Sequence, residues 1–338
     1  MASCRRGSEV RKRASGRTNR WRTRGAAALA ATLVFLSLQA GAASAKGSSA
    51  ALHSAERPPA SQAAAKPAAV GPFRPLVLAH RGASADAPEN TFAAFELALR
   101  QGADYIELDV QLSRDGVPFV LHDEKLERTT DGRGIASRRT MRELESLDAG
   151  GWFGEAYRGE RIPRFEEVLR RYGGKIGLLV ELKDPQLQPG LERAVAAALI
   201  RFGLTGEQRL EAGGPGWRRA PVIVQSFSLP SLKRLGELMP SVPLGVILSR
   251  EEELEQSRLH EMADIATYAN LRKQLAQPKL VRRVHGSGMA VFVWTVDRRR
   301  EAVQAAAAGA DGIVTDGPDR FRDWIKKTPD GIRRPSGS

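Results

Sequence analysis

The sequence predicts a single α/β domain, a TIM-type (β/α)8 barrel with a β-hairpin excursion after its second strand. Short apolar runs alternate along residues 73–327 with segments that carry the period of amphipathic helices, as a sheet of parallel strands requires. The length of this region agrees with the ~250 residues typical of one such barrel. Several apolar runs end in polar residues, and the carboxyl ends of barrel strands form the active-site rim.

Nine apolar runs are candidates for strands, and eight strands close a barrel. The interval between the second and third runs is too short for a parallel crossover, and Asp115-Gly116 is a hairpin turn signal. We therefore predict that the third run returns antiparallel to the second and that the other eight form the barrel. The runs are 75–79, 105–110, 117–121, 176–182, 222–226, 244–248, 264–268, 290–295 and 312–315.

The connecting segments predict the helices that cover the barrel. Asn90 or Thr91 can cap a first helix that runs to Gln101, because a short polar side chain there accepts a hydrogen bond from the first turn. Asp316 precedes the last helix and Pro318 begins it, so we expect Asp316 mainly to cap that helix. Further helices are expected at 165–172, 190–202, 229–238, 251–260, 273–286, 298–308 and 318–327.

The second run carries acidic residues that share one face of the predicted strand. Side chains two positions apart point the same way, so Glu107, Asp109 and Gln111 lie together. Glu181 lies near the end of the fourth run, where Glu181 and Lys183 repeat this arrangement. Carboxylates buried side by side repel one another, and a divalent cation removes this conflict. Because oxygen ligands favour Mg2+ or Ca2+ over zinc, we expect Glu107, Asp109 and Glu181 to hold one such ion.

Two histidines and two cationic residues also stand at strand ends. His80 and Arg81 follow the first run, His122 follows the third, and Lys183 follows the fourth. Two imidazoles can divide the acid and base steps of a hydrolysis near neutral pH. Singly, each residue has a structural alternative, either an ordinary polar strand end or an ion pair. Their convergence on one rim favours a phosphate-cleaving centre.

Together these residues form a set of motifs that resembles the glycerophosphodiester phosphodiesterase family. The motifs keep the family's order and spacing over nearly the whole predicted domain. Two positions depart from its pattern, Ser228 where an acidic residue often stands and Arg164 where a threonine often stands. The matching motifs are Leu78-Ala-His80-Arg81-Gly82, Pro88-Glu89-Asn90-Thr91, Glu107-Leu-Asp109-Val110, Asp115-Gly116, His122-Asp123, Glu181-Leu-Lys183, Gln225-Ser226-Phe227, Trp294-Thr295-Val296 and Thr315-Asp316.

The resemblance implies a metal-dependent barrel enzyme that hydrolyses glycerophosphodiesters to sn-glycerol 3-phosphate and an alcohol. It also implies a role for each matching residue: His80 and His122 as the acid and base pair, Glu107, Asp109 and Glu181 as metal ligands, and Arg81 and Lys183 as phosphate contacts. Trp294 matches a position that can wall the substrate pocket, although a tryptophan in an apolar run can equally belong to the core. We favour His80 as base and His122 as acid.

Two other functions are compatible with the same residues. A lysophospholipase D or sphingomyelinase D-like enzyme would keep the fold and cleave a lipid phosphodiester, and an apolar pocket rim would favour it. A barrel that binds glycerophosphate-like ligands without turnover is the alternative from another class. The sequence leaves open the head group, the oligomeric state, and whether water or a substrate hydroxyl attacks phosphorus.

The net charge of +13 does not by itself indicate a nucleic-acid-binding protein. Residues 1–24 hold nine Arg or Lys and one Glu, which leaves about +5 for the remainder, without a basic stripe of interleaved aromatics. An uncharged stretch at 25–40 leads to Ala43-Ser44-Ala45, a pattern that export peptidases prefer. We therefore expect a cleaved signal peptide at 1–45, no stable membrane anchor afterwards, and a periplasmic or extracellular protein.

The remaining segments complete the predicted organisation. Residues 46–72 are dominated by Ala, Ser, Pro and Gly and are expected to form a disordered linker before the catalytic domain at 73–327. Residues 328–338 are expected to be a flexible tail. The single cysteine, Cys4, lies in the expected signal peptide, so the mature protein would contain neither a disulfide nor a thiolate metal site.

Overall fold

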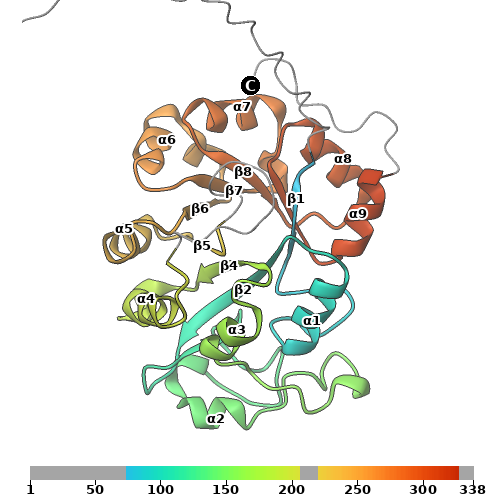
Figure 1. Cartoon of the computed structure of the whole chain (residues 1–338), viewed down its shortest axis with the longest axis vertical. Coiled ribbons are helices and arrows are strands. Elements are labelled where there is room, and N and C mark those ends of the chain that lie inside the picture. Colours follow the sequence, from blue (N-terminus) through green and yellow to red (C-terminus); the bar gives the residue numbers. More distant parts are fainter. Residues whose placement is uncertain (1–73, 206–219, 327–338) are drawn as a thin grey trace, which may run out of the picture. The chain divides into compact units, whose positions relative to one another are not determined.

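A computed structural model of the chain describes residues 74–205 and 220–326. The predicted signal peptide, linker and tail lie outside the described residues, so their assignment stays a prediction. Within the described residues, a ring of parallel strands is surrounded by helices, which confirms the predicted barrel (Figure 1). None of the helices in these ranges is long and apolar enough to cross a membrane.

Eight strands close the barrel through the parallel pairing of its first and last members. Leu76 of the first strand lies opposite Gly312 of the last, and Leu78 pairs with Tyr105 on the other side. The strands are β1 (Leu76–Ala79), β2 (Tyr105–Leu112), β4 (Gly177–Leu182), β5 (Val222–Ser226), β6 (Leu244–Leu248), β7 (Tyr268–Arg272), β8 (Ala290–Trp294) and β9 (Gly312–Thr315).

The predicted excursion is present as a hairpin between β2 and the short strand β3 (Pro118–Val120). The two strands pair antiparallel, with Val110 opposite Val120, and the turn includes Gly116 at a φ of 78°. Past the end of β3, the amide of Leu121 donates to the carbonyl of Asp109 at 3.0 Å. The hairpin thereby returns the next residue, His122, to the level of the acidic pair.

The sixth barrel strand, β7, lies four residues later than the predicted run at 264–268. The amides of Ile265 and Ala266 bond back to the carbonyl of Met262, so these apolar residues complete the end of a helix. The strand itself, β7, contains the polar residues Asn270 and Arg272. Because of them it does not form a continuous apolar run. The run at 264–268 was therefore wrong as a strand, although a strand does follow it.

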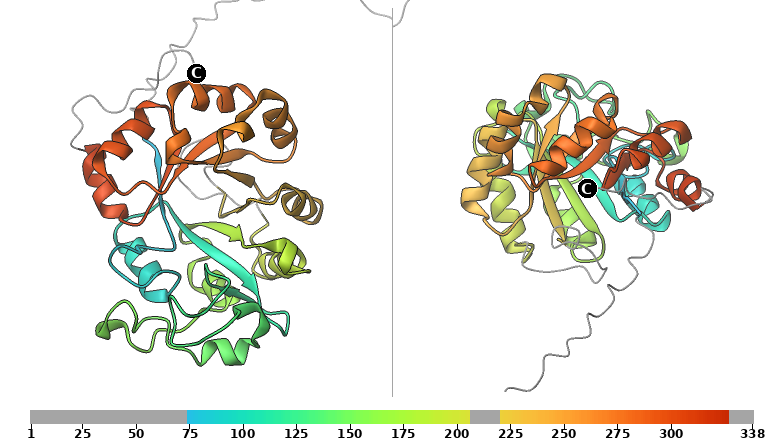
Figure 2. Two further views of the ribbon diagram at one scale, coloured as in Figure 1. Left: turned by 180° about the vertical axis from the view of Figure 1, so that it is seen from behind. Right: turned by 90° about the horizontal axis from the view of Figure 1, so that it is seen from above.

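The helices lie on the outside of the strands in each view of the molecule (Figures 1 and 2). Thr91 caps the first helix, its hydroxyl accepting from the amide of Ala94. Two predicted helices, 251–260 and 273–286, are each divided into a 3-10 turn and a later α-helix. The α-helices are α1 (Phe92–Arg100), α2 (Met141–Glu145), α3 (Phe165–Tyr172), α4 (Leu191–Arg201), α5 (Leu229–Leu238), α6 (Gln256–Ala263), α7 (Pro278–Gly286), α8 (Arg299–Ala307) and α9 (Pro318–Lys326).

Side chains alternate along β2 between the helical layer and the barrel interior. Ile106 and Leu108 belong to the large core that the strands share with the helices. Tyr105 lies in a smaller interior core, where its ring covers Gly177 so closely that a Cβ there would lie 2.3 Å from it. Glu107 follows Tyr105 on the same face, towards the carboxyl end of the strand. The interior core thus closes the barrel below the acidic residues.

Candidate active site

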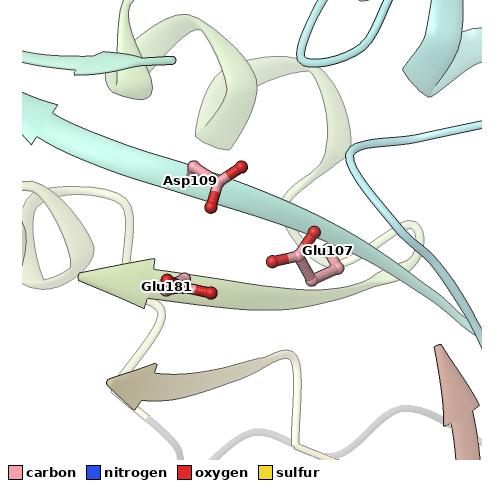
Figure 3. Close-up of side chains that lie close together, drawn as sticks. All are labelled: Glu107, Asp109 and Glu181. Carbon is pink, nitrogen blue, oxygen red and sulfur yellow. The ribbon is translucent and has the colours of Figure 1, made fainter. Parts of the chain in front are cut away.

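Three carboxylates from neighbouring strands converge at the carboxyl end of the barrel. Glu107 and Asp109 come from β2, and Glu181 comes from β4, where it lies opposite Asp109 (Figure 3). One oxygen of each lies within 4.8 Å of the others, and all three side chains are buried. A buried set of oxygen donors fits a hard divalent cation such as Mg2+ or Ca2+. The three expected ligands are therefore together.

Two cations lie against these carboxylates. The Lys183 ammonium is 2.8 Å from Glu181 Oε1 and 3.7 Å from Asp109 Oδ1. Arg81 Nε lies 3.3 Å from Asp109 Oδ2, and the backbone amide of Arg81 donates to Glu107 Oε2 at 2.9 Å. Both expected phosphate contacts are thus oriented by the residues that can hold the metal.

A tight turn after β1 places Arg81 in this position. Arg81 has a φ of 57° and Gly82 a φ of 84°, both in the left-handed region. A Cβ on Gly82 would lie 2.7 Å from the backbone of Ala94 in α1, so the turn and the helix can pack closely only with glycine there. The strain at Arg81 is of the kind that accumulates at functional sites.

His80 is held by a residue from the opposite end of the domain. Its Nδ1 lies 2.7 Å from Asp316 Oδ1, in the loop after β9, and Ser84 donates to the same oxygen at 3.0 Å. The expectation that Asp316 mainly caps the last helix did not include this contact. A carboxylate on Nδ1 fixes the tautomer and leaves Nε2 for chemistry.

His122 is held by its neighbour in the chain. Its Nδ1 lies 2.6 Å from Asp123 Oδ1, so this ring is also oriented through Nδ1. Gln111, which shares the face of the acidic pair, donates to the carbonyls of Leu121 and Asp123 at 2.8 Å each. These two bonds tie the segment that carries His122 to β2.

Burial and local charge shift the pKa values of neighbouring carboxyl groups in opposite directions. In the protein alone, burial and the adjacent Asp109 raise the pKa of Glu107 to about 8. Burial also disfavours ionised Asp109, but Arg81 and Lys183 outweigh it and hold the pKa of Asp109 well below its ordinary value. The local cations therefore do not fully neutralise the triad, which suits a site that accepts a further cation.

The pKa values of the two histidines are also shifted in opposite directions. Burial and the charge of Arg81 lower the pKa of His80, but the hydrogen bond to Asp316 and the charges of Glu107 and Asp316 outweigh them, and the pKa is raised overall. Burial also lowers the pKa of His122, where the charges of Arg81 and Lys183 add to it and outweigh the opposing effect of Asp109. Similar imidazole–carboxylate pairs are thus biased in opposite directions.

A cavity of about 130 Å³ brings these groups together. Seven of the eight residues expected at the site line it, and Asp109 lies next to them in the triad. An apolar wall faces the charged one, where Phe227 and Trp294 meet edge to face with ring centroids 6.0 Å apart. The seven lining residues are His80, Arg81, Glu107, His122, Glu181, Lys183 and Trp294.

Several residues of the site had no predicted role in it. Asn90 donates to Asp109 Oδ2 at 2.8 Å, although the sequence placed it only in a matching motif and as a possible helix cap. Asn270 lines the cavity and donates to Gln225 Oε1 at 2.9 Å. Correct placement of β7 would have brought Asn270 to the rim. Arg128 contacts both Glu89 and Asp123. Apart from its charge, nothing in the sequence indicated that Arg128 belongs to the site.

Known proteins resemble this chain in sequence over the same region. Residues 80–320 match the glycerophosphoryl diester phosphodiesterase family. The chain is 42% identical over 244 residues to the protein YhdW of Bacillus subtilis (strain 168), a match that covers 72% of this chain and 95% of the relative. It is 36% identical over 265 residues to a glycerophosphodiester phosphodiesterase of Caldanaerobacter subterraneus subsp. tengcongensis, covering 75% of this chain and 99% of that protein.

A solved structure extends the similarity to the fold. A phosphodiesterase from Oleispira antarctica, determined in complex with the product sn-glycerol-3-phosphate, superposes with a TM-score of 0.65 at 29% identity. The match covers 75% of this chain and 97% of the solved chain. The matched region thus spans almost all of the related protein.

Proposed function

Because this chain belongs to the glycerophosphoryl diester phosphodiesterase family, we propose that it hydrolyses glycerophosphodiesters to sn-glycerol 3-phosphate and an alcohol with the help of a divalent cation. One observation carries the proposal. Three buried carboxylates, two histidines and two cations surround a single cavity, and each group has a part in phosphodiester cleavage. The product bound in the Oleispira antarctica structure supports this choice of substrate.

The proposed mechanism begins with charge neutralisation. Glu107, Asp109 and Glu181 would hold the cation, which when bound would supply Lewis acidity to the anionic phosphodiester. Arg81 and Lys183 would bind phosphate oxygens and stabilise the charge that develops during the displacement. Their contacts with the triad hold both cations at the cavity before substrate arrives.

The two histidines would then move the protons. His80 would accept the proton of the attacking oxygen, and His122 would donate a proton to the departing alcohol. Each ring has Nδ1 turned to a carboxylate, so Nε2 is the nitrogen that would exchange the proton. Phosphorus-31 NMR during turnover would reveal a cyclic phosphate if a substrate hydroxyl attacks, and none if water attacks.

A turnover assay tests the proposal directly. The full-length protein is incubated with glycerophosphocholine and Mg2+ or Ca2+, and sn-glycerol 3-phosphate is measured. We expect product release that stops with a chelator and returns when the cation is restored. A barrel that only binds its ligand would retain glycerophosphocholine and release nothing, and that result would refute the proposed activity.

One observation favours lipid phosphodiesters as a second class of substrate. Phe227 stands at the cavity with 52% of its surface exposed and packs against Trp294. An aromatic surface of this kind can hold an acyl chain or an apolar alcohol. Lysophosphatidylcholine is the matching probe: a lysophospholipase D-like activity predicts its hydrolysis, and Phe227→Ala should lower that rate more than the rate with glycerophosphocholine.

We also infer export of the protein through the segment at 1–45. Its basic start, uncharged stretch and Ala43-Ser44-Ala45 support a cleaved signal. Amino-terminal sequencing of the mature protein should begin at Lys46. A protein that starts earlier would carry the segment as an anchor or an uncleaved leader.

A further inference from the structure

Arg128 lies on the segment after His122 and joins two carboxylates. Its Nε and Nη2 donate to the two oxygens of Asp123 at 2.6 and 2.9 Å. Its Nη1 and Nη2 donate to the two oxygens of Glu89 at 2.6 and 2.8 Å. The planar guanidinium can form such a pair of forks, whereas an ammonium group cannot.

Each of these carboxylates also contacts a residue that lines the cavity. Asp123 Oδ1 is 2.6 Å from Nδ1 of His122, and Glu89 Oε1 accepts from Nη1 of Arg81 at 2.8 Å. A continuous row of alternating charges therefore runs from His122 on the excursion to Arg81 on the loop after β1. Arg128 is the centre of this row.

We propose that Arg128 is a positioning residue of the reaction, which sets the direction of His122 through Asp123 and of Arg81 through Glu89. The inference rests on the proposed phosphodiesterase function and deepens it. One side chain would thereby align a proton-transfer group and a phosphate-binding group that come from separate loops. Alignment of this kind is how outer contacts contribute to catalysis.

The segment after β3 that carries Arg128 has other contacts that maintain its backbone without this side chain. Leu126 is buried, and its amide donates to the carbonyl of Gly134. The amide and the hydroxyl of Thr130 both donate to the carbonyl of Leu126. Gln111 separately ties the backbone on either side of His122 to β2. Loss of Arg128 should therefore leave the segment folded and free the carboxylates of Asp123 and Glu89 to rotate.

The test compares Arg128 with a second arginine in the same connection between β3 and β4. Arg158 forms a similar fork with Glu155, at 2.7 and 2.6 Å, but this pair is exposed and joins no histidine. In the full-length protein, Arg128→Gln should lower kcat by about 10- to 100-fold and raise KM only a few-fold. Arg128→Lys should be nearly as poor, because it keeps the charge and loses the fork. Arg158→Gln should match the wild type.

A spectroscopic readout separates positioning from stability. The chain has five histidines, so nitrogen-15 spectra of the imidazoles are simple enough to follow the ring of His122, assigned with His122→Asn. We expect the Nδ1–H tautomer in the wild type and a mixture of tautomers in Arg128→Gln, with an unchanged thermal midpoint. A purely structural role would move the midpoint and leave the tautomer of the folded protein as it was.

The outcomes separate the inference from the proposed function. If the wild type is active, and Arg128→Gln equals Arg158→Gln in kcat and in tautomer, the inference is overturned while the function stands. If the wild type is inactive, the proposed function fails, and an unchanged His122 tautomer in Arg128→Gln would overturn the inference as well. Loss of the folded state in both Arg128 variants would make the residue structural and would also overturn it.

Discussion

The two histidines of the active site are held in different ways. His80 is oriented by Asp316, which lies 236 positions away, so this pair joins the first and last strands of the barrel. His122 is oriented by the adjacent residue Asp123 on an excursion outside the barrel. One pair exists only because the barrel closes, and the other depends on how a single hairpin is anchored.

The carboxylates also differ in what else they bind. Asp316 shares its oxygen with the neutral hydroxyl of Ser84, whereas Asp123 is shared with the cation Arg128. Burial and Arg81 lower the pKa of both histidines. At His122 the charge of Lys183 adds to them and the pKa is lowered, whereas at His80 the hydrogen bond to Asp316 prevails and the pKa is raised. The protonation bias of each histidine therefore depends both on the hydrogen bond within its pair and on the charges around it.

The largest expected effect comes from removing either imidazole. His80→Ala and His122→Ala should each lower kcat for glycerophosphocholine by at least roughly 10³-fold, because a proton-transfer step loses its group. Circular dichroism and the thermal midpoint should stay close to the wild type, since both rings stand at the cavity. Activity is measured as release of sn-glycerol 3-phosphate.

A substrate with a good leaving group sharpens this test. If His122 protonates the departing alcohol, His122→Ala should lose much less activity with a p-nitrophenyl phosphodiester, because p-nitrophenolate leaves without a proton. His80→Ala should stay inactive with both substrates. The opposite pattern would exchange the two roles, and full activity in either variant would refute the pair.

A smaller effect is expected from neutralising the partner carboxylates. Asp316→Asn and Asp123→Asn should each lower kcat by about 10- to 100-fold, because each imidazole loses the acceptor that fixes its tautomer. Asp316 raises the pKa of His80, so its loss should shift the corresponding limb of the kcat/KM profile to lower pH. Asp123 has a weaker influence on the pKa of His122, so that limb should move less. Equal shifts would contradict the comparison.

Local sequence signals were sufficient for most of the barrel. The helix α5 matches the predicted range 229–238, and the antiparallel return after Asp115-Gly116 was predicted from a turn signal and a short interval. Both depend on neighbours in the chain. The strand β7 was misplaced because its polar residues break the apolar pattern, and one of them, Asn270, faces the cavity. Apolar runs therefore locate a strand least well where the strand contributes polar residues to the active site.

The site itself was predictable only in part. Glu107, Asp109 and Glu181 were found because the alternation of a strand and the register of parallel neighbours bring them together. The partners of the histidines required the closed fold. The pairing of Asp316 with His80 spans the whole domain, and the forks of Arg128 depend on side-chain directions in two loops. Sequence periodicity carries no information about either.

The smallest effect is a change in stability with pH, and it concerns the carboxylate beside His80. In the metal-free protein, Glu107 binds a proton up to about pH 8, whereas in the unfolded chain it releases that proton near its ordinary value. The folded state then binds more protons than the unfolded state, so the free energy of unfolding should fall as pH rises from 5 to 8. Glu107→Gln should flatten this slope in urea titrations with a chelator, and added Mg2+ or Ca2+ should offset the loss in the wild type. Asp109→Asn should reduce the slope only in part, because the charge of Asp109 is one cause of the raised pKa of Glu107 and burial is the larger one. Equal slopes in the wild type and Glu107→Gln would show that Glu107 is ionised without a cation, and its charge would then act on His80 over the whole range.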